Sequence, residues 1–162
     1  MFTGSQIVDQ LRQAGITHVV WLPDSALGEW EHDLANAPGL ELVRVCREGE
    51  AWAVAMGLYL GGQRPMVMIQ CTGLFESGDA LRNALCDYGL PLFALIGYRS
   101  YLGETAIKGD TARTFTEPIL QAWGIDYVIL DTADKLPLFL EHFRACQAAG
   151  KPGVVLLGEG RV

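Results

Sequence analysis

Glu48 is the residue of this chain that is best placed for proton chemistry. It follows the apolar segment 40–45 and opens a segment rich in Ala and Gly that includes Gly57. A carboxylate where a strand gives way to a helix lies at the edge of a parallel sheet where ligands bind, and small residues let another backbone or a flat ring come close. The alternative is that Glu48 only interacts favourably with the helix dipole, as acids in a first turn commonly do. Its position alone leaves both interpretations open.

Polar residues and glycines also follow three other apolar segments. Asp24 and Ser25 follow the first, Gly73 lies in the segment after the third, and Arg99 follows the fourth. Each has a structural explanation by itself: a helix cap, a turn glycine or a surface charge. Because the carboxyl ends of parallel strands share one edge of a sheet, these residues together favour a functional site at that edge.

Six short apolar segments alternate with helix-length segments, without a linker or a repeat. We expect strands at residues 17–21, 41–45, 66–69, 92–96, 127–130 and 153–157. We expect helices at about residues 7–14, 27–34, 47–61, 77–87, 116–123 and 135–149. Continuous Val, Ile and Leu runs are typical of parallel strands buried on both faces. The sequence therefore predicts one α/β domain over residues 1–162, a three-layer doubly wound, flavodoxin-like sandwich with a six-stranded parallel sheet.

The composition excludes several classes of protein. Half of the 162 residues are hydrophobic, and the net charge is -7 with no block of like charges. Nucleic acid is not an expected partner, because a phosphate backbone calls for a clustered Lys and Arg face. No apolar stretch reaches membrane-spanning length, and the first residues lack the charged start and apolar core of a signal peptide. We expect a soluble, cytoplasmic protein that does not interact with membranes.

The four cysteines are isolated in the sequence. Cys46, Cys71, Cys86 and Cys146 form no C-x-x-C pair, and the three histidines are spread far apart along the chain. Such spacing does not match the ligand patterns of zinc sites or of disulfide frameworks. We expect reduced thiols, buried or half-buried, and no metal site in this chain.

The loops, in their order along the chain, resemble the pyrimidine-binding domain of thiamine diphosphate enzymes, and within that family the sulfopyruvate decarboxylase alpha subunit and phosphonopyruvate decarboxylase. The resemblance covers nearly the whole chain and is carried by residues 16–25, 47–51 with Gly57 nine residues after Glu48, 72–74 and 95–99. It implies that Glu48 contacts a ring nitrogen of the cofactor's aminopyrimidine and shares a proton there, which activates the cofactor toward a 2-oxo acid. Glu50, two residues away, cannot face the same way on a helix.

The same resemblance assigns further residues to the cofactor and to the substrate. Beside Glu48, the cofactor is expected to contact Pro23, Thr72, Gly73 and Leu74. The substrate, a small anionic 2-oxo acid, is expected to contact Asp24, Ser25 and, through a sulfonate or phosphonate group, Arg99 or Lys108.

A motif of the companion domain in this family does not occur in the sequence. That domain binds magnesium and the diphosphate through Gly-Asp-Gly, whereas Asp79 and Asp110 follow a glycine but do not precede one. We therefore expect a beta-type partner chain that binds Mg2+ and shares thiamine diphosphate with this chain, and self-association of the pyrimidine domains. The expected enzyme is a carbon-carbon lyase, a 2-oxo acid decarboxylase, that is inactive without its partner. Exposed apolar side chains for the interface are expected at Trp52, Leu74 and Phe75.

Three positions depart from the family pattern and leave alternatives open. Phe75, Glu76 and Asp79 stand where the relatives usually have glycine or asparagine, and acids near the cleft would repel an anionic substrate. The alternatives are a non-catalytic or regulatory pyrimidine-domain module and a subunit of a carboligating, acetolactate synthase-like enzyme. A flavodoxin-like nucleotide or electron carrier is disfavoured, because segment 22–25 offers no phosphate-binding glycine-rich turn.

Overall fold

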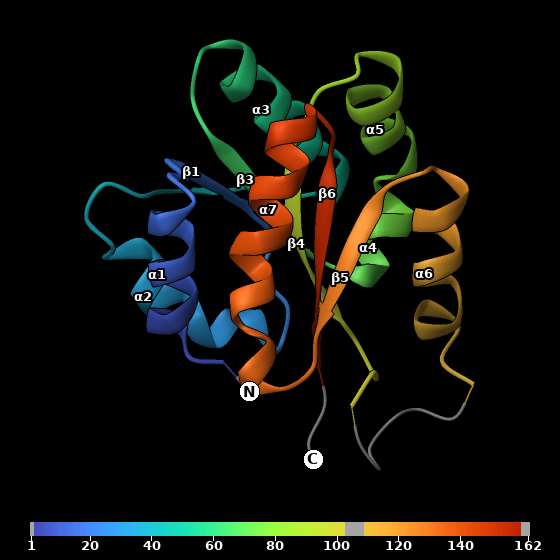
Figure 1. The fold of residues 1–162 in the computed structure, drawn as a ribbon. Coiled ribbons are helices and arrows are strands. Elements are labelled where there is room, and N and C mark those ends of the chain that lie inside the picture. Colours follow the sequence, from blue (N-terminus) through green and yellow to red (C-terminus); the bar gives the residue numbers. More distant parts are fainter. Residues whose placement is uncertain (1, 103–108, 160–162) are drawn as a thin grey trace.

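The structure is a computed structural model that describes residues 2–102 and 109–159. These residues form one sheet of six parallel strands in the order β2-β1-β3-β4-β6-β5 (Figure 1). The strands are β1 (His18–Trp21), β2 (Glu41–Arg44), β3 (Pro65–Gln70), β4 (Phe93–Tyr98), β5 (Asp126–Leu130) and β6 (Gly153–Gly158). The predicted fold class is confirmed, and each strand lies within two residues of its predicted bounds.

Helices cover both faces of the sheet (Figure 1). They are α1 (Gly4–Gln13), α2 (Glu31–Ala35), α3 (Glu48–Leu60), α4 (Cys71–Glu76), α5 (Gly78–Arg82), α6 (Thr111–Ala122) and α7 (Pro137–Ala149). Shorter helical turns are η1 (Leu27–Trp30), η2 (Asn83–Asp87) and η3 (Ala133–Lys135).

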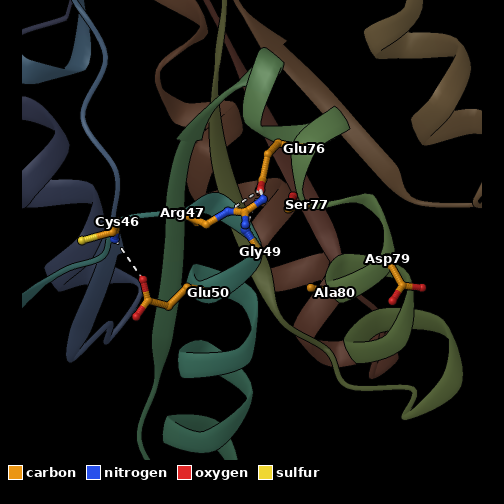
Figure 2. A pocket seen from close by; sticks show the side chains of 8 residues that line it. All are labelled: Cys46, Arg47, Gly49, Glu50, Glu76, Ser77, Asp79 and Ala80. Atoms are coloured by element: carbon orange, nitrogen blue, oxygen red, sulfur yellow. Dashed lines mark hydrogen bonds and ion pairs between the residues drawn. The ribbon is translucent and has the colours of Figure 1, made fainter.

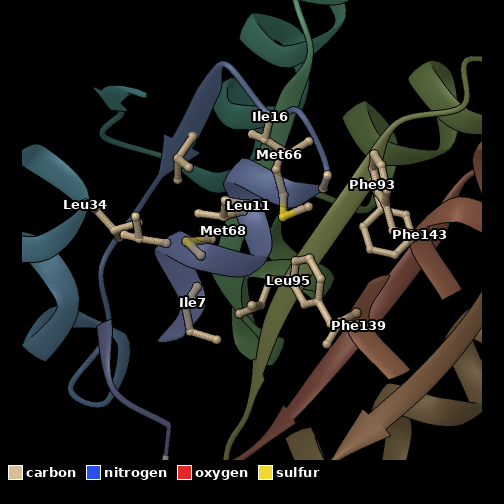
Figure 3. Packing of buried hydrophobic residues seen from close by; sticks show 14 of the residues in the cluster. Ile7, Leu11, Ile16, Leu34, Met66, Met68, Phe93, Leu95, Phe139 and Phe143 are labelled. Atoms are coloured by element: carbon tan, nitrogen blue, oxygen red, sulfur yellow. The ribbon is translucent and has the colours of Figure 1, made fainter. Parts of the chain in front are cut away.

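The first core cluster lies between the sheet and helices α1, α2 and α7 (Figure 3). Strand side chains alternate between the two faces, so this cluster takes every second residue of a strand. Its members include Ile7, Leu11, Leu34, Met66, Met68, Phe93, Leu95, Phe139 and Phe143. The Phe93 ring meets the Phe143 ring edge-on with centroids 5.1 Å apart, which fixes α7 against β4.

The second core cluster lies on the opposite face, beneath α3, α4, α5 and α6. It takes the intervening strand residues, among them Val20, Val67, Ile69, Ala94 and Ile96. Trp52 of α3 and Leu74 of α4 are fully buried in this cluster. The apolar faces of these helices therefore fix the position of the loops at the sheet edge.

The strand order reverses at β1, which lies between β2 and β3. In the register, Trp21 at the end of β1 lies beside Arg44 of β2 and Met68 of β3. A reversal of this kind opens a crevice at the carboxyl ends of β1 and β3, where ligands of open α/β sheets bind. The segments after β1, β2 and β3 all begin at this edge.

Helix α4 occupies residues 71–76, between the predicted strand at 66–69 and the predicted helix at 77–87, where the sequence predicts no helix. Cys71 and Leu74 are one helical turn apart, and both are fully buried. Gly73 between them lowers the intrinsic helix propensity, so the sequence pattern alone does not indicate a helix here. Burial of the two apolar side chains outweighs that cost.

Helix α6 begins at Thr111, earlier than the predicted start at Thr116. The Asp110 carboxylate accepts a hydrogen bond from the Ala112 N–H at 3.0 Å and so caps the helix. Pro118 lies inside the helix, where proline is normally excluded, and its position favours a later start in a sequence-based prediction.

The four cysteines are free, as expected. Cys71 and Cys146 are buried, but Cys46 and Cys86 are exposed, contrary to the expectation of burial for all four. Cys46 follows the edge strand β2 and Cys86 lies at the surface of η2, where no further layer covers them. Among the described helices, none is long and apolar enough to cross a membrane.

Replacing Phe139 with Ala tests the first core cluster. Phe139 is fully buried against Phe93, so we expect Phe139→Ala to lower the free energy of unfolding by about 3–5 kcal/mol in urea titrations. Phe115→Ala is the matched control, because Phe115 is 55% exposed, and it should change the free energy by less than about 0.5 kcal/mol. Equal losses in the two variants would contradict the packing described here.

Candidate active site

Glu48 is the first residue of α3, and its half-buried side chain lies against Gly73 of α4. A Cβ atom at position 73 would lie 2.6 Å from Glu48 Oε1 and closer still to its Cγ atom. The hydrogen side chain of Gly73 therefore makes room for the carboxylate. Within residues 2–102 and 109–159, the Glu48 carboxylate has no hydrogen-bond partner, so it is available to a ligand at the sheet edge.

Glu76 holds the first turn of α3 from outside that helix (Figure 2). Its Oε2 atom accepts a hydrogen bond from the Gly49 N–H at 2.9 Å, and its Oε1 atom accepts one from Arg47 Nε at 2.9 Å. The Arg47 side chain itself does not cap the helix, so Glu76 satisfies an N–H that the helix leaves free. The Arg47 and Gly49 bonds lower the pKa of Glu76 below its usual value. Glu76 thus fixes the backbone beside Glu48.

A pocket of about 480 Å3 lies between the start of α3 and the α4–α5 segment (Figure 2). Its lining residues are Cys46, Arg47, Gly49, Glu50, Ser77, Asp79, Ala80 and Glu76. Glu48 is not among them, because its side chain turns toward Gly73 instead. The Glu50 carboxylate accepts a hydrogen bond from the Cys46 N–H at 2.9 Å, which agrees with the prediction that Glu50 and Glu48 face different ways.

Both acids that depart from the family pattern are paired with arginines. Glu76 bonds Arg47, and Asp79 bonds Arg82 at 2.9 Å. Pairing offsets the repulsion that two bare carboxylates would exert on an anionic ligand. Phe75 is half-buried against the second core cluster.

The expectation that Trp52 and Leu74 are exposed is wrong, since both are fully buried. Trp52 Nε1 donates to the Ser77 hydroxyl at 3.0 Å, and that hydroxyl donates to the Gly73 carbonyl at 2.6 Å. These bonds tie α3 to α4 directly behind Glu48. The apolar residues that α3 exposes are Ala53, Gly57 and Leu60, the last of them 67% exposed.

Asp24 organises the loop after β1. Its Oδ1 atom accepts hydrogen bonds from the Ala26 and Leu27 N–H groups, both at 2.7 Å. Its carboxyl group turns inward, whereas Pro23 and Ser25 are exposed at the sheet edge. Ser25 is thus the residue of this loop with an accessible polar side chain.

A row of polar side chains crosses the same edge from β3 to β6. The exposed Thr72 hydroxyl donates to Gln70 Oε1 at 3.2 Å, and Gln70 Nε2 donates to Glu159 Oε2 at 3.4 Å. Glu159 is buried and is the member that sequence reasoning missed. The signal that could identify it is an acid directly after the last buried strand, whereas the predicted site takes residues from the segments after the first four strands.

The remaining residues predicted for the site are Arg99, Leu74 and Lys108. Arg99 Nε lies 3.3 Å from Asp110 Oδ2, and the Arg99 side chain is 42% exposed. The Ser100 hydroxyl, the Ala112 N–H and the Arg99 guanidinium hold the pKa of Asp110 below its usual value. Leu74 is fully buried, and Lys108 lies outside the described residues. The structure therefore brings the segments of Ser25, Glu48, Thr72 and Gly73 to one edge and places Arg99 at the end of β4.

The described part of the chain contains no group of three or more His, Cys, Asp or Glu side chains that could hold a metal ion. The chemistry that this edge offers is that of an accessible carboxylate, a serine hydroxyl and a threonine hydroxyl beside a close-packed glycine.

A family model described as "Thiamine pyrophosphate enzyme, N-terminal TPP binding domain" matches residues 1–116 of the chain. Sulfopyruvate decarboxylase of Methanosarcina acetivorans is 28% identical over 134 residues, which cover 82% of this chain and 34% of that protein. Sulfopyruvate decarboxylase subunit alpha of Methanococcus maripaludis is 24% identical over 135 residues, 83% of this chain and 81% of that subunit. Phosphonopyruvate decarboxylase of Streptomyces viridochromogenes is 27% identical over 151 residues, 92% of this chain and 37% of that protein.

These matches confirm the resemblance that the sequence motifs indicate. The chain spans about a third of the Methanosarcina and Streptomyces proteins but most of the Methanococcus subunit. It therefore corresponds to one part of the larger proteins.

A double-mutant cycle tests the contact between Gly73 and Glu48. We expect Gly73→Ala alone to lower the free energy of unfolding by about 1–3 kcal/mol, because the new methyl group collides with Glu48. In a Glu48→Ala background the same change should be neutral or stabilising, since Ala favours a helix over Gly by about 1 kcal/mol. An equal loss in both backgrounds, measured by urea unfolding, would show that the two residues are not in contact.

Proposed function

Because the chain belongs to the thiamine pyrophosphate enzyme family through its N-terminal TPP binding domain, we propose that it is the alpha-type subunit of a thiamine diphosphate-dependent 2-oxo acid decarboxylase. The observation that carries this proposal is Glu48, a half-buried carboxylate at the strand-order reversal without a partner among the described residues. The names of the relatives support a substrate of the sulfopyruvate or phosphonopyruvate kind.

The residues around Glu48 fit the aminopyrimidine ring of the cofactor. Gly73 has no side chain to block the carboxylate, and the bonds from Glu76 and Ser77 hold the flanking helices in place. Glu48 would hold a proton against a ring nitrogen, while Pro23, Thr72 and Gly73 would line the ring. Leu74, which is fully buried in the second core cluster, would support the ring site without contacting the cofactor. When bound, thiamine diphosphate supplies the electron sink for the loss of carbon dioxide.

The substrate would lie beside the loop after β1. In this proposal the exposed Ser25 hydroxyl donates to a carboxylate or carbonyl oxygen, and Asp24 lies next to it. Arg99 or Lys108 would bind the second anionic group of the substrate. The Arg99 guanidinium has five N–H donors, so its pairing with Asp110 leaves donors for a sulfonate or phosphonate.

A beta-type partner chain would bind Mg2+ and the diphosphate and complete the site. Helix α3 supports this part of the proposal, because beyond its first turn it is apolar on all sides and exposes Ala53, Gly57 and Leu60. A helix without a polar face is typical of a buried position in an assembly. Self-association of pyrimidine domains, activity as a carbon-carbon lyase only within the complex, and a cytoplasmic location belong to the same proposal.

Glu48→Gln tests the catalytic part of the proposal. Glutamine has nearly the same shape but cannot take up the proton, so kcat of the complex reconstituted with the partner chain should fall by at least about 100-fold. Glu50→Gln is the matched control on the same helix. It should keep the native rate, because among the residues that the structure describes the Glu50 carboxylate bonds the Cys46 N–H and faces away from Glu48. An unchanged rate in Glu48→Gln would favour the alternative, a non-catalytic or regulatory module.

The requirement for a partner is tested with the chain alone. With thiamine diphosphate, Mg2+ and sulfopyruvate or phosphonopyruvate added, we expect no carbon dioxide release above background until the beta-type chain is present. Release by the chain alone would contradict the division of the site between two chains. Product analysis of the complex separates an aldehyde from the condensation product of an acetolactate synthase-like enzyme.

A further inference from the structure

Glu159 is a buried acid that the proposed function leaves without a role. It directly follows β6, and only 6% of its surface is exposed. Its N–H donates to the Tyr98 carbonyl at 3.1 Å, and its carbonyl accepts from the Leu102 N–H at 2.9 Å. The backbone of Glu159 is therefore fixed beside the end of β4.

The Glu159 carboxyl group reaches across β4 to the loop after β1, where it meets the Asp24 carboxyl group. Gly97 of β4 makes this possible, because a Cβ atom there would lie 2.7 Å from Asp24 Oδ2 and would overlap Glu159 Oε1. These two oxygen atoms are both buried, and neither has a hydrogen-bond donor among the residues that the structure describes. One acid thus faces another, each with an unsatisfied oxygen.

A single proton between the two groups satisfies both oxygens. Two ionised carboxylates at hydrogen-bond distance repel each other strongly, and a buried acceptor without a donor is costly. Burial first, and then the Asp24 charge, raise the pKa of Glu159 to about 8. The other groups that face Glu159 are Gln70 and Arg99, which favour its ionised form, and the Cys71 thiol.

We propose that Glu159 is a positioning residue that shares one proton with Asp24 and thereby holds the loop of residues 22–26, with Ser25, at the carboxyl edge of the sheet. The link runs through Asp24, whose other oxygen binds the Ala26 and Leu27 N–H groups at the turn into η1. The shared proton is a property of this chain alone. Its effect on substrate binding through Ser25 rests on the proposed function.

The link weakens at alkaline pH. An unfolded Glu loses its proton near its ordinary pKa of about 4.3, whereas the folded chain keeps it to about pH 8. The folded state therefore binds more protons between these values, and the contribution of Glu159 to stability falls as the pH rises through this range. Above pH 8 two carboxylates face each other, and the loop is released from β6.

Glu159→Gln replaces the shared proton with a permanent N–H donor. The melting temperature of the variant should lie close to that of the native chain at pH 5, and the gap in favour of the variant should widen steadily as the pH rises to 8.5. Glu141→Gln is the matched control, an exposed acid on α7 that should not change this pH dependence. A difference in melting temperature between the native chain and Glu159→Gln that does not change with pH would contradict the shared proton.

Nuclear magnetic resonance of the full chain tests positioning directly. With 13C-labelled glutamate, the Glu159 carboxyl resonance, assigned by its loss in Glu159→Gln, should titrate near pH 8, and the Ser25 amide resonance should move with the same midpoint. In Glu159→Gln the Ser25 amide should stay constant over that range. Titration of the Glu159 carboxyl resonance near pH 4–5 would overturn the proposal. A Ser25 amide resonance that does not shift when Glu159 titrates would also overturn it.

The reconstituted complex separates this inference from the proposed function. We expect KM of the native enzyme to rise as the pH increases beyond 8, with kcat less affected, and KM of Glu159→Gln to stay level. A native complex without decarboxylase activity would refute the proposed function, while the Ser25 resonance would still decide the role of Glu159. A KM rise of equal size in Glu159→Gln would count against positioning through the shared proton.

Discussion

The position of Glu48 depends on a close approach between α3 and α4 that only a glycine allows. At Gly73 the carboxylate takes the space that any side chain would fill, so the two helix starts can pack around one functional group. Three side chains hold this arrangement: Trp52 and Ser77 tie the helices together behind Glu48, and Glu76 binds the free N–H of Gly49. Because the tryptophan also belongs to the second core cluster, the geometry of the site is continuous with the packing of the domain.

A second glycine, Gly97 in β4, also makes room for acidic side chains. Gly97 in β4 gives room to Asp24 and Glu159, so two of the acids at the sheet edge are accommodated by the absence of a Cβ atom. Glu48 and Glu159 differ in their surroundings, and therefore in their chemistry. Glu48 is half-buried and open to a ligand, whereas Glu159 is buried against another acid and keeps its proton to about pH 8. Environment rather than residue type thus distinguishes an acid that can serve a cofactor from one that holds a loop.

The strands, their parallel arrangement and the position of Glu48 at the start of a helix could be predicted from the sequence. Continuous apolar runs and the Glu48-to-Gly57 spacing are local signals. Helix α4 could not be predicted, because its stability comes from the burial of Cys71 and Leu74 and not from the intrinsic helix propensity of its residues. Trp52 was misplaced for a related reason: an apolar residue on a helix that is apolar on all sides gives no periodic signal of which face is buried. Contacts between distant segments, such as Glu76 with Gly49 or Glu159 with Asp24, depend on the tertiary fold.

The role that we propose for Glu48 is to share a proton with a cofactor that a second chain holds. The most direct test is the 15N chemical shift of the aminopyrimidine ring nitrogens in labelled thiamine diphosphate, bound to the reconstituted complex. With the native chain, one ring nitrogen should move toward the position of a protonated nitrogen, and with Glu48→Gln it should remain where the free cofactor has it. The same shift with both chains would contradict the role of Glu48.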